Sequence, residues 1–178
     1  MAAFTIRPSH PSDADDIATL FARSCSEAYK HLFPASFLAR YTPTRQRERW
    51  NYHLENLPTS HRIFVAVSTE ANTAIGFIEV GPSEEENTGE IHYLFVSPAS
   101  MGVGVGTALI KSGENWLAEK GYRNGYLWVF CNNNVGKTFY LSKGWRESGV
   151  AQEEPMLIRD GISVMECKLK KVLREPIN

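Results

Sequence analysis

The spacing of apolar positions in the first third of the chain predicts a short strand followed by helices. Residues 4–7 (FTIR) alternate in the manner of an edge strand. Ser12 and Asp15 then fit a capping box, in which Ser12 accepts a hydrogen bond from the first helical turn and Asp15 reaches back. The apolar positions behind this box that recur at helical spacing are Ile17, Leu20, Phe21, Cys25 and Ala28. The chain restarts at Pro34, and residues 42–57 are predicted to form a second, more polar helix.

From residue 61 onward the apolar period becomes that of strands. Strands are predicted over residues 61–69, 73–81, 90–96, 125–130, 144–152 and 161–169. Helices are predicted over residues 107–121 and 133–143, and Gly121 ends the first of them. The resulting order of strands and helices is typical of a mixed α/β sheet with flanking helices, in a single domain that spans residues 1–178.

The composition fits an ordinary globular domain and argues against two classes of partner. The chain has 178 residues, of which 43% are hydrophobic, and 19 basic against 20 acidic residues give a formal charge of −1. A nucleic-acid-binding surface would need a clustered excess of Lys and Arg, so no nucleic-acid partner is expected. No stretch approaches the roughly 20 apolar residues of a membrane span, so no membrane partner is expected either.

The cysteines and histidines are scattered. Cys25, Cys131 and Cys167 are odd in number and form no CxxC pair or Cys/His cluster, so we expect neither a disulfide framework nor a metal site. The first ten residues lack a long apolar run and show no signal peptide. These observations together predict a reducing, cytoplasmic compartment.

The tripeptide Gly136-Lys137-Thr138 satisfies the second half of a nucleotide-binding P-loop. The first glycine of that pattern should stand at position 131, which is Cys131. No predicted strand ends in an aspartate that would hold Mg²⁺. The sequence therefore argues against a nucleotide hydrolase, and the tripeptide needs another explanation.

A glycine-rich loop offers an alternative anion site. Gly102, Gly104 and Gly106 lie between a predicted strand and a predicted helix. Glycine lets backbone N–H groups turn toward an anion, and a helix N-terminus adds positive potential. A dinucleotide fingerprint would require a glycine at Thr107, so that pattern is not met. A glycine-rich connection that binds no ligand is the alternative interpretation.

Residues 90–145 resemble motifs A and B of the GNAT acetyltransferase superfamily. Motif A of that family is a strand ending in V-x-P that leads to [Q/R]-x-x-G-x-[G/A], whose amides hold the pyrophosphate of acetyl-CoA. The stretch "LFVSPASMGVGVG" matches through Val96, Pro98, Gly104 and Gly106. It departs at Met101, where the family usually has Gln or Arg, so one side-chain donor to the pyrophosphate is missing.

Motif B of the family explains the tripeptide. The pattern N-x-x-A-x-x-[F/L]-Y-x-x-x-G-[F/W] matches "NNVGKTFYLSKGW", which begins at Asn133 and ends at Trp145, with Gly136 in the alanine place. A glycine there costs roughly 1 kcal/mol of helix propensity and is tolerable where a ligand packs against the helix. The resemblance implies that Lys137 offers its charge to the phosphates of the cofactor.

The resemblance implies acetyl-CoA as cosubstrate, no metal, and a GNAT-like mixed sheet. The implied cofactor-binding residues are Leu94, Phe95, Val96, Met101, Gly102, Val103, Gly104, Val105, Gly106, Thr107, Asn133, Lys137 and Tyr140. More weakly, nearly the whole chain is similar to a branch of small-molecule enzymes related to polyamine acetyltransferases. In that branch the N-terminal helices shape the acceptor pocket.

Acetyl transfer requires an uncharged amine, and two residues of the motif A strand are candidates to accept its proton. Glu90 stands where histone-acetylating members of the family carry a catalytic glutamate, and a solvated strand-end residue is the alternative. On a regular strand Glu90, His92 and Leu94 share one face. His92 would then share the proton path or orient a water, unless it is merely a satisfied polar residue of a half-buried strand.

Two further roles follow from the resemblance. The oxyanion would bind a backbone N–H near Phe95 or Val96, where members of the family have a strand bulge. Tyr140 occupies a place near the cofactor sulfur and would protonate the departing thiolate, because a phenol with a pKa near 10 suits that step. A packed aromatic residue is the alternative for Tyr140.

The acceptor side is harder to interpret. The acidic run from Glu84 to Glu86 is typical of a solvated loop rather than of a site for a cation. The aromatic residues that either line an acceptor pocket or belong to the core are Tyr29, Phe33, Phe37 and Trp50. We therefore expect an N-acetyltransferase that acts on a primary amine of a small molecule or a protein. A non-catalytic acyl-CoA-binding regulatory domain is the alternative, and a homodimer is one of the assemblies that the sequence allows.

Overall fold

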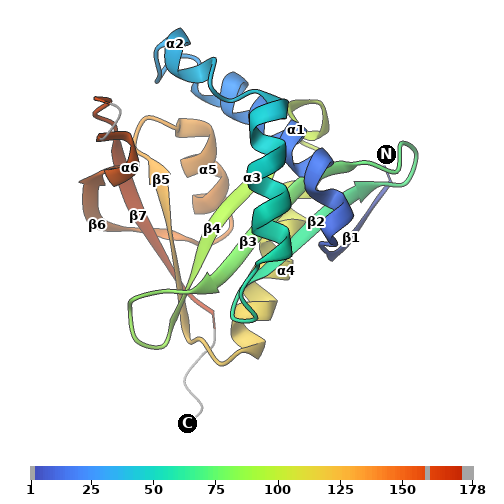
Figure 1. Ribbon diagram of the computed structural model, residues 1–178. Coiled ribbons are helices and arrows are strands. Elements are labelled where there is room, and N and C mark those ends of the chain that lie inside the picture. Colours follow the sequence, from blue (N-terminus) through green and yellow to red (C-terminus); the bar gives the residue numbers. More distant parts are fainter. Residues whose placement is uncertain (1–2, 159–160, 174–178) are drawn as a thin grey trace.

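The computed structural model describes residues 3–158 and 161–173, and one seven-stranded sheet runs through this part of the chain (Figure 1). The strands are β1 (Phe4–Pro8), β2 (Arg62–Ser68), β3 (Ala74–Pro82), β4 (Thr88–Val96), β5 (Asn124–Phe130), β6 (Arg146–Glu153) and β7 (Met165–Val172). They stand in the order β1-β2-β3-β4-β5-β7-β6. Strands β4 and β5 pair in parallel, and the other five neighbouring pairs are antiparallel. The predicted mixed sheet is thus confirmed.

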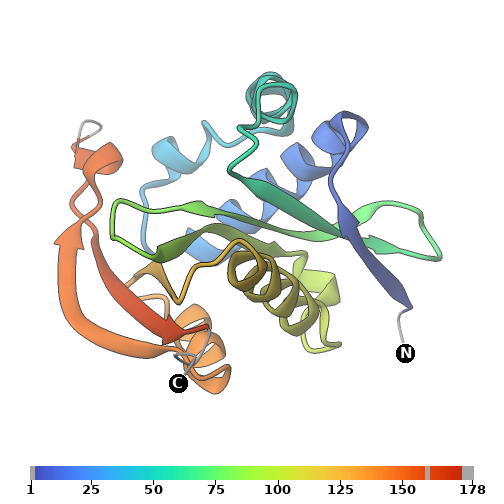
Figure 2. The same ribbon diagram turned by 90° about the horizontal axis from the view of Figure 1, so that it is seen from below.

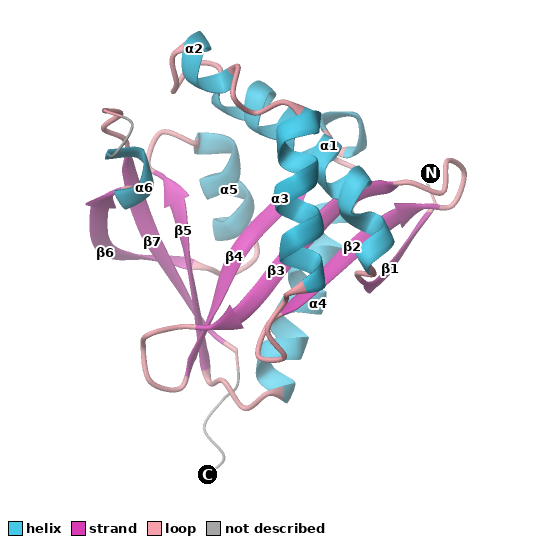
Figure 3. Cartoon of the chain, viewed as in Figure 1, coloured by secondary structure: helices cyan, strands magenta, loops and turns pink. Residues whose placement is uncertain are grey.

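The helices cover the sheet on both faces. They are α1 (Ala14–Tyr29), α2 (Ala35–Leu38), α3 (Pro43–Glu55), α4 (Val105–Glu119), α5 (Asn134–Ser142) and α6 (Pro155–Ile158). Figure 2 shows α1, α2 and α3 on one side of the sheet and α4 and α5 on the other. In Figure 3 the helices α1 and α3 lie in front of β2 and β3, whereas the front of β4, β5 and β7 is not covered by them.

Each face of the sheet has its own hydrophobic core, and these cores place β4 between two layers of helix. The α4-side core includes Ile78, Ile91, Leu109, Leu117, Leu127 and Trp145. The α1/α3-side core includes Ile17, Phe21, Trp50, Val65 and Phe77. Helix α4 lies so close to β3 that a Cβ on Gly113 would stand 2.8 Å from the side chain of Ile78. Such dense packing makes the sheet a rigid frame for the residues that it carries.

The start of α1 differs from the predicted capping box. In the structure the box lies two residues earlier, because the side chain of His10 accepts from the backbone of Ser12 while Asp13 accepts from the backbone N–H of His10 at 2.7 Å. Asp15 instead forms an ion pair with Arg47 of α3 at 2.8 Å. The prediction of Ser12 and Asp15 was wrong because a turn of 3₁₀ helix, Pro11–Asp13, precedes α1 and shifts the frame.

The other helices and strands begin and end close to the positions predicted from the sequence. Gly121 adopts a positive φ of 96° directly after α4, as expected for a helix-terminating glycine. Helix α6 and the 3₁₀ turn Pro98–Ser100 were not predicted, because segments of three or four residues carry no periodic signal. Among the described residues no helix is both long enough and apolar enough to cross a bilayer.

Candidate active site

Strands β4 and β5 pair at one end only and then diverge. Their parallel ladder joins Thr88 through Ile91 to Asn124 through Leu127. Beyond it β4 continues alongside β3 as far as Val96, while β5 continues alongside β7. Figure 1 shows the two arrows separating, with α5 behind the space between them. Beyond Ile91 this divergence, called the opening below, leaves one edge of β4, at the centre of the sheet, without a strand partner within residues 3–158 and 161–173.

The glycine loop ends at this opening and leads into α4. Gly102 and Gly104 have φ values of 78° and 95°, which side chains rarely adopt, and a Cβ at either position would meet nothing within 4 Å. Gly104 is the N-cap of α4, and no side chain caps that helix. The first N–H groups of a 15-residue helix therefore face an open space, as in an anion-binding helix terminus. Met101 is exposed beside them.

Helix α5 begins directly behind the opening, and its capping explains why position 136 is a glycine. The side chain of Asn133 accepts a hydrogen bond from the N–H of Gly136 at 3.0 Å. A Cβ on Gly136 would stand 2.8 Å from the amide nitrogen of Asn133. The glycine thus makes room for the cap rather than for a ligand.

Lys137 has a partner within the protein. Its ammonium group contacts Glu147 of β6 at 2.8 Å, and 22% of its side chain is exposed. The resemblance implied a contact between Lys137 and the phosphates of the cofactor, whereas in the structure its ammonium group is paired with Glu147 of β6.

Tyr140 lies on α5 and packs against the α4-side core. Its ring is 6.3 Å from that of Trp145, and burial raises the pKa of its hydroxyl. Across the sheet, Tyr29 of α1 has a raised pKa, mainly because of burial and in part because Tyr140 is within electrostatic reach. Both phenols therefore stay protonated near neutral pH.

Glu90 lies at the closed end of the opening and faces the α1/α3 side. A Cβ on its neighbour Gly89 would contact Leu117 of α4, so Glu90 points to the opposite face. Tyr126 of β5, its partner in the parallel ladder, donates a hydrogen bond to the carboxylate of Glu90 at 2.7 Å. Burial and this bond raise the pKa of Tyr126. Sequence reasoning missed Tyr126, because the register between β4 and β5 is set by the fold.

Glu90 and His92 lie on one face of β4, and a bulge at His92 brings Tyr93 to that face as well. Opposite β3, the register jumps from Glu79 with Tyr93 to Val80 with Ile91, and His92 is the extra residue. The predicted sharing of a face by Glu90, His92 and Leu94 is therefore only partly right, because Leu94 packs on the α4-side core. The bulge also lies earlier than the predicted position near Phe95 and Val96, both of which pair regularly with β3.

His92 is available for a further interaction. Its Nδ1 lies 3.6 Å from Glu90, and its ring stacks on that of His61 with centroids 5.1 Å apart. Burial, followed by the nearby His92, lowers the pKa of His61. Within the ranges that the structure describes, the buried Nε2 of His92 has no hydrogen-bond partner. A bound amine or water would supply one.

The aromatic residues considered for the acceptor pocket are mostly core. Phe33 and Phe37 are buried against Leu157, and Trp50 is 1% exposed within the α1/α3-side core. Tyr29 is partly buried and packs both on the α1/α3-side core and on the small cluster around Leu157. Filling the core is thus the main role of these rings.

The acidic loop likewise serves the fold, through one of its residues. Glu85 pairs with Lys168 and, at 3.0 Å, with Lys170, both on β7. Lys168 in turn lies 3.7 Å above the ring of Tyr126. The carboxylate of Glu85 is therefore committed to β7 rather than free to bind a cation.

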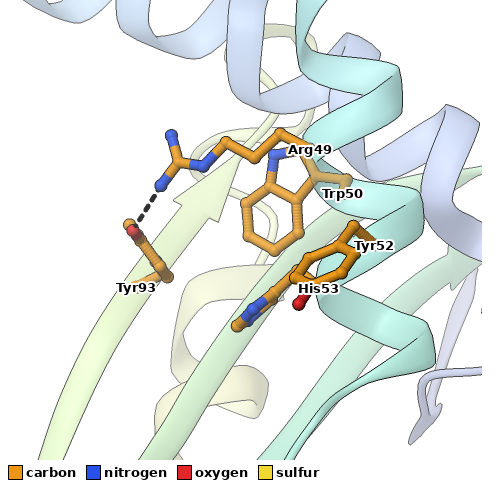
Figure 4. Close-up of a pocket in the computed structure, with 5 residues that line it drawn as sticks. All are labelled: Arg49, Trp50, Tyr52, His53 and Tyr93. Carbon is orange, nitrogen blue, oxygen red and sulfur yellow. Dashed lines mark hydrogen bonds between the residues drawn. The ribbon is translucent and has the colours of Figure 1, made fainter.

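A depression between α3 and β4 was not predicted. It is lined by Arg49, Trp50, Tyr52, His53 and Tyr93 (Figure 4). Arg49 donates a hydrogen bond to the hydroxyl of Tyr93 at 2.9 Å, and His53 pairs with the buried Glu79 at 2.8 Å. The sequence signal was weak, because arginines on a polar helix are usually solvated.

The cysteines contradict the prediction. Cys131 and Cys167 form a disulfide, whereas Cys25 is free and buried. The two half-cystines are 36 positions apart in sequence, and the antiparallel ladder between β5 and β7 brings their Cα atoms to 5.3 Å. Spacing alone showed no framework, because the contact depends on strand order. Among the described residues no group of three or more metal-binding side chains occurs.

The sequence is similar to known acetyltransferases. The model of the acetyltransferase (GNAT) family matches residues 24–145. An uncharacterised N-acetyltransferase of Archaeoglobus fulgidus is 31% identical over 156 residues, which cover 84% of this chain and 99% of that protein. The mycothiol acetyltransferase of Renibacterium salmoninarum is 29% identical over 86 residues, or 46% of this chain and 25% of that protein.

Solved structures share the fold. The PaiA N-acetyltransferase of Thermoplasma acidophilum, solved in complex with coenzyme A, superposes with a TM-score of 0.71 at 20% identity. The alignment covers 96% of this chain and 99% of that one. The family match spans more than half of the sequence and includes the glycine loop and most of the motifs around the opening between β4 and β5. The chain belongs to the GNAT family of acetyltransferases.

Proposed function

We propose that this acetyltransferase transfers the acetyl group of acetyl-CoA directly to a primary amine of a small molecule, with both substrates bound at once. The observation that carries the proposal is the placement of Glu90 and Tyr140. Glu90 lies on β4 at the closed end of the opening and faces the α1/α3 side, whereas Tyr140 lies on α5 and packs against the α4-side core. A base on one side and an acid on the other suit the two proton transfers of the reaction.

Acetyl-CoA would bind on the α4/α5 side. The amides of the glycine loop and the first turn of α4, from Gly102 to Thr107, would hold the pyrophosphate. Leu94 and Val96 face the α4-side core, where the pantetheine arm would approach the opening. Met101 supplies no polar side-chain donor, so backbone N–H groups alone would recognise the pyrophosphate.

The amine would enter on the α1/α3 side and lose its proton there. An alkylamine has a pKa of about 10.4, so an uncharged amine at pH 7 costs about 4–5 kcal/mol. Glu90 is held by Tyr126 and accepts the proton directly or through the unpartnered Nε2 of His92. The free amine then attacks the thioester carbonyl.

The last steps of the reaction, formation of the amide and release of coenzyme A, would take place on the α4/α5 side of the sheet. The new C–N bond forms as the C–S bond breaks, and the free edge of β4 beyond Ile91 offers backbone N–H groups to the oxyanion. Coenzyme A leaves as a thiolate and takes the proton of Tyr140, while the second proton of the attacking nitrogen passes to solvent and Tyr140 regains a proton from solvent. Because burial raises the pKa of Tyr140, its proton is in place across the working pH range.

A panel of amines tests the proposal. Incubation with acetyl-CoA and each amine should release free thiol in proportion to acetylated product. Acetyl-CoA that raises the melting temperature but yields no amine-dependent thiol with any amine would contradict the proposal and favour a regulatory acyl-CoA-binding domain.

A variant of the base sharpens this test. Glu90→Gln should lower kcat/KM most at low pH, where the amine is almost wholly protonated, and the defect should shrink toward pH 10. A profile parallel to that of the parent between pH 6 and 10 would remove Glu90 from proton transfer.

The proposal also includes a location. We infer that the protein works in the cytoplasm, where small thiols would keep Cys131 and Cys167 largely reduced. Thiol labelling of protein taken directly from cells measures which form exists. A fully labelled pair supports the cytoplasmic location, and an unlabelled pair contradicts it.

A further inference from the structure

A positive charge without an acidic partner lies on the acceptor side of the opening. Arg49 lines the depression between α3 and β4, and no carboxylate forms an ion pair with it in the described part of the chain. Its neighbour Arg47, by contrast, is bound to Asp15 at 2.8 Å. A guanidinium group that is held in place but not neutralised is a candidate for binding an anion.

The protein holds Arg49 in a defined position. The guanidinium carbon lies 5.6 Å from the centre of the Phe21 ring, and one nitrogen donates to the hydroxyl of Tyr93 at 2.9 Å (Figure 4). Its charge also reaches the interior, because it partly offsets the effect of burial, which raises the pKa of Cys25 to about 12. One hydrogen bond uses one of the five N–H donors of a guanidinium, so a ligand can occupy others.

The position of Tyr93 ties this charge to the reaction. Tyr93 follows Glu90 by three residues on β4, beyond Ile91, where β4 has already left β5. It packs on the α1/α3-side core, the side that Glu90 also faces. An anion bound at Arg49 would therefore lie on the same face of the sheet as an amine that gives its proton to Glu90.

We propose that Arg49, positioned by Tyr93, binds a carboxylate of the acceptor. The substrate is then an amine that also carries a carboxylate, as a free amino acid does, with its two ends directed to Glu90 and Arg49. This inference rests on the proposed function and narrows its substrate class. A planar guanidinium fork matches the two oxygens of a carboxylate, and a single cation balances its single charge. A polyamine has no group for this site and would place further positive charge near it.

Matched pairs of acceptors test the inference. Each amino acid of a panel is compared with its own carboxamide, which keeps the amine and side chain but lacks the negative charge. A polyamine and an aminophosphonate complete the panel. For the best amino acid we expect kcat/KM to exceed that of its amide by about 10- to 100-fold, the usual range for a charge-assisted hydrogen bond.

Variants link the preference to Arg49. Arg49→Gln should raise the KM of the amino acid by a similar factor, leave the amide unaffected, and so abolish the discrimination. Arg49→Lys should restore part of it, because the charge remains while the fork is lost. Arg47→Gln removes the same charge from the same helix, away from the depression, and should keep the preference.

The outcomes separate the two proposals. If amines are acetylated but acids and amides react equally, or if Arg49→Gln lowers both alike, the carboxylate site is wrong and the acetyltransferase proposal stands. A polyamine or an aminophosphonate preferred over every amino acid also overturns the inference. If acetyl-CoA binds but no amine reacts, the proposed function itself fails.

Discussion

The two faces of the opening between β4 and β5 present different kinds of chemical group. On the α4/α5 face the chain offers main-chain N–H groups, glycines and one half-buried phenol, Tyr140. On the α1/α3 face it offers charged side chains, among them Glu90 and Arg49, which come from strands and helices far apart in sequence. The first face is assembled from a nearly continuous segment, and the second from most of the chain.

This difference matches the ligand that each face is proposed to bind, acetyl-CoA on the α4/α5 face and the amine on the α1/α3 face. A cofactor that is always the same can be held by backbone groups, whose positions are set by helix and loop geometry. An acceptor is distinguished by charge and shape, so side chains must converge on it from several elements. The comparison therefore predicts that changes on one face affect acetyl-CoA, and changes on the other affect the choice of amine.

The largest expected effect concerns the phenol behind the opening. Tyr140→Phe keeps the ring packing but removes the proton donor, so kcat should fall by about 10²–10⁴-fold with little change in acetyl-CoA affinity. Steady-state kinetics and a thermal-shift titration measure the two quantities. Full activity in the variant would leave Tyr140 as a packing residue and pass protonation of the thiolate to solvent.

The disulfide links the segment that precedes α5 to strand β7, because Cys131 lies before α5 and Cys167 lies on β7. Replacing both by Ser should lower the free energy of unfolding by about 4 kcal/mol under oxidising conditions, as expected for a closed loop of this length. Denaturant unfolding with and without a reductant measures it. Reductant should destabilise the parent and leave the double variant unchanged, and equal responses would show that the bond does not form.

The glycine loop has an internal control. Gly104 and Gly121 have φ values of 95° and 96°, both have free space around a Cβ, and they flank the same helix. Gly104→Val and Gly121→Val should therefore cost similar backbone strain. Only the first should lose the stabilisation by acetyl-CoA, which at 100 times Kd is about 2.7 kcal/mol, or about 5–10 °C.

Two results would contradict this assignment. An unchanged acetyl-CoA shift in Gly104→Val would show that the loop is merely a connection. Stabilisation of the parent by ATP with Mg²⁺ but not by acetyl-CoA would return attention to Gly136-Lys137-Thr138 as a phosphate site.

The smallest expected effect is a change in stability with pH that is due to one buried carboxylate. Glu166 of β7 is buried, and mainly for that reason its pKa is raised. The folded state then holds the proton more tightly than the unfolded state, so stability falls as pH rises from about 4.5 through the folded-state pKa. Glu166→Gln should remove this loss and make the protein slightly more stable at pH 7 but not at pH 4. The exposed Glu119→Gln serves as control, and identical pH dependence in both variants would contradict the prediction.

Sequence patterns predicted elements and motifs where the signal is local. The helical and strand periods located α1, α3, α4, α5 and most strands, and the glycines at 102–106 marked the loop that precedes α4. The capping-box pattern misplaced the α1 cap by two residues, and the resemblance implied a β4 bulge near Phe95 and Val96 that the structure has at His92, because neither position is encoded by periodicity. It also did not predict the cystine, since strand order brings those residues together.

The sequence by itself determined the mixed fold, the family and the glycine loop, because hydrophobic period and short motifs act over neighbouring residues. Only the tertiary structure decided which side chains gather on the face proposed for the acceptor. The bond from Tyr126 to Glu90 depends on parallel register, and the placement of Arg49 over Phe21 and beside Tyr93 depends on how α3 packs on the sheet. Contacts between distant segments form only when the core sets their distance, and substrate choice resides in those contacts.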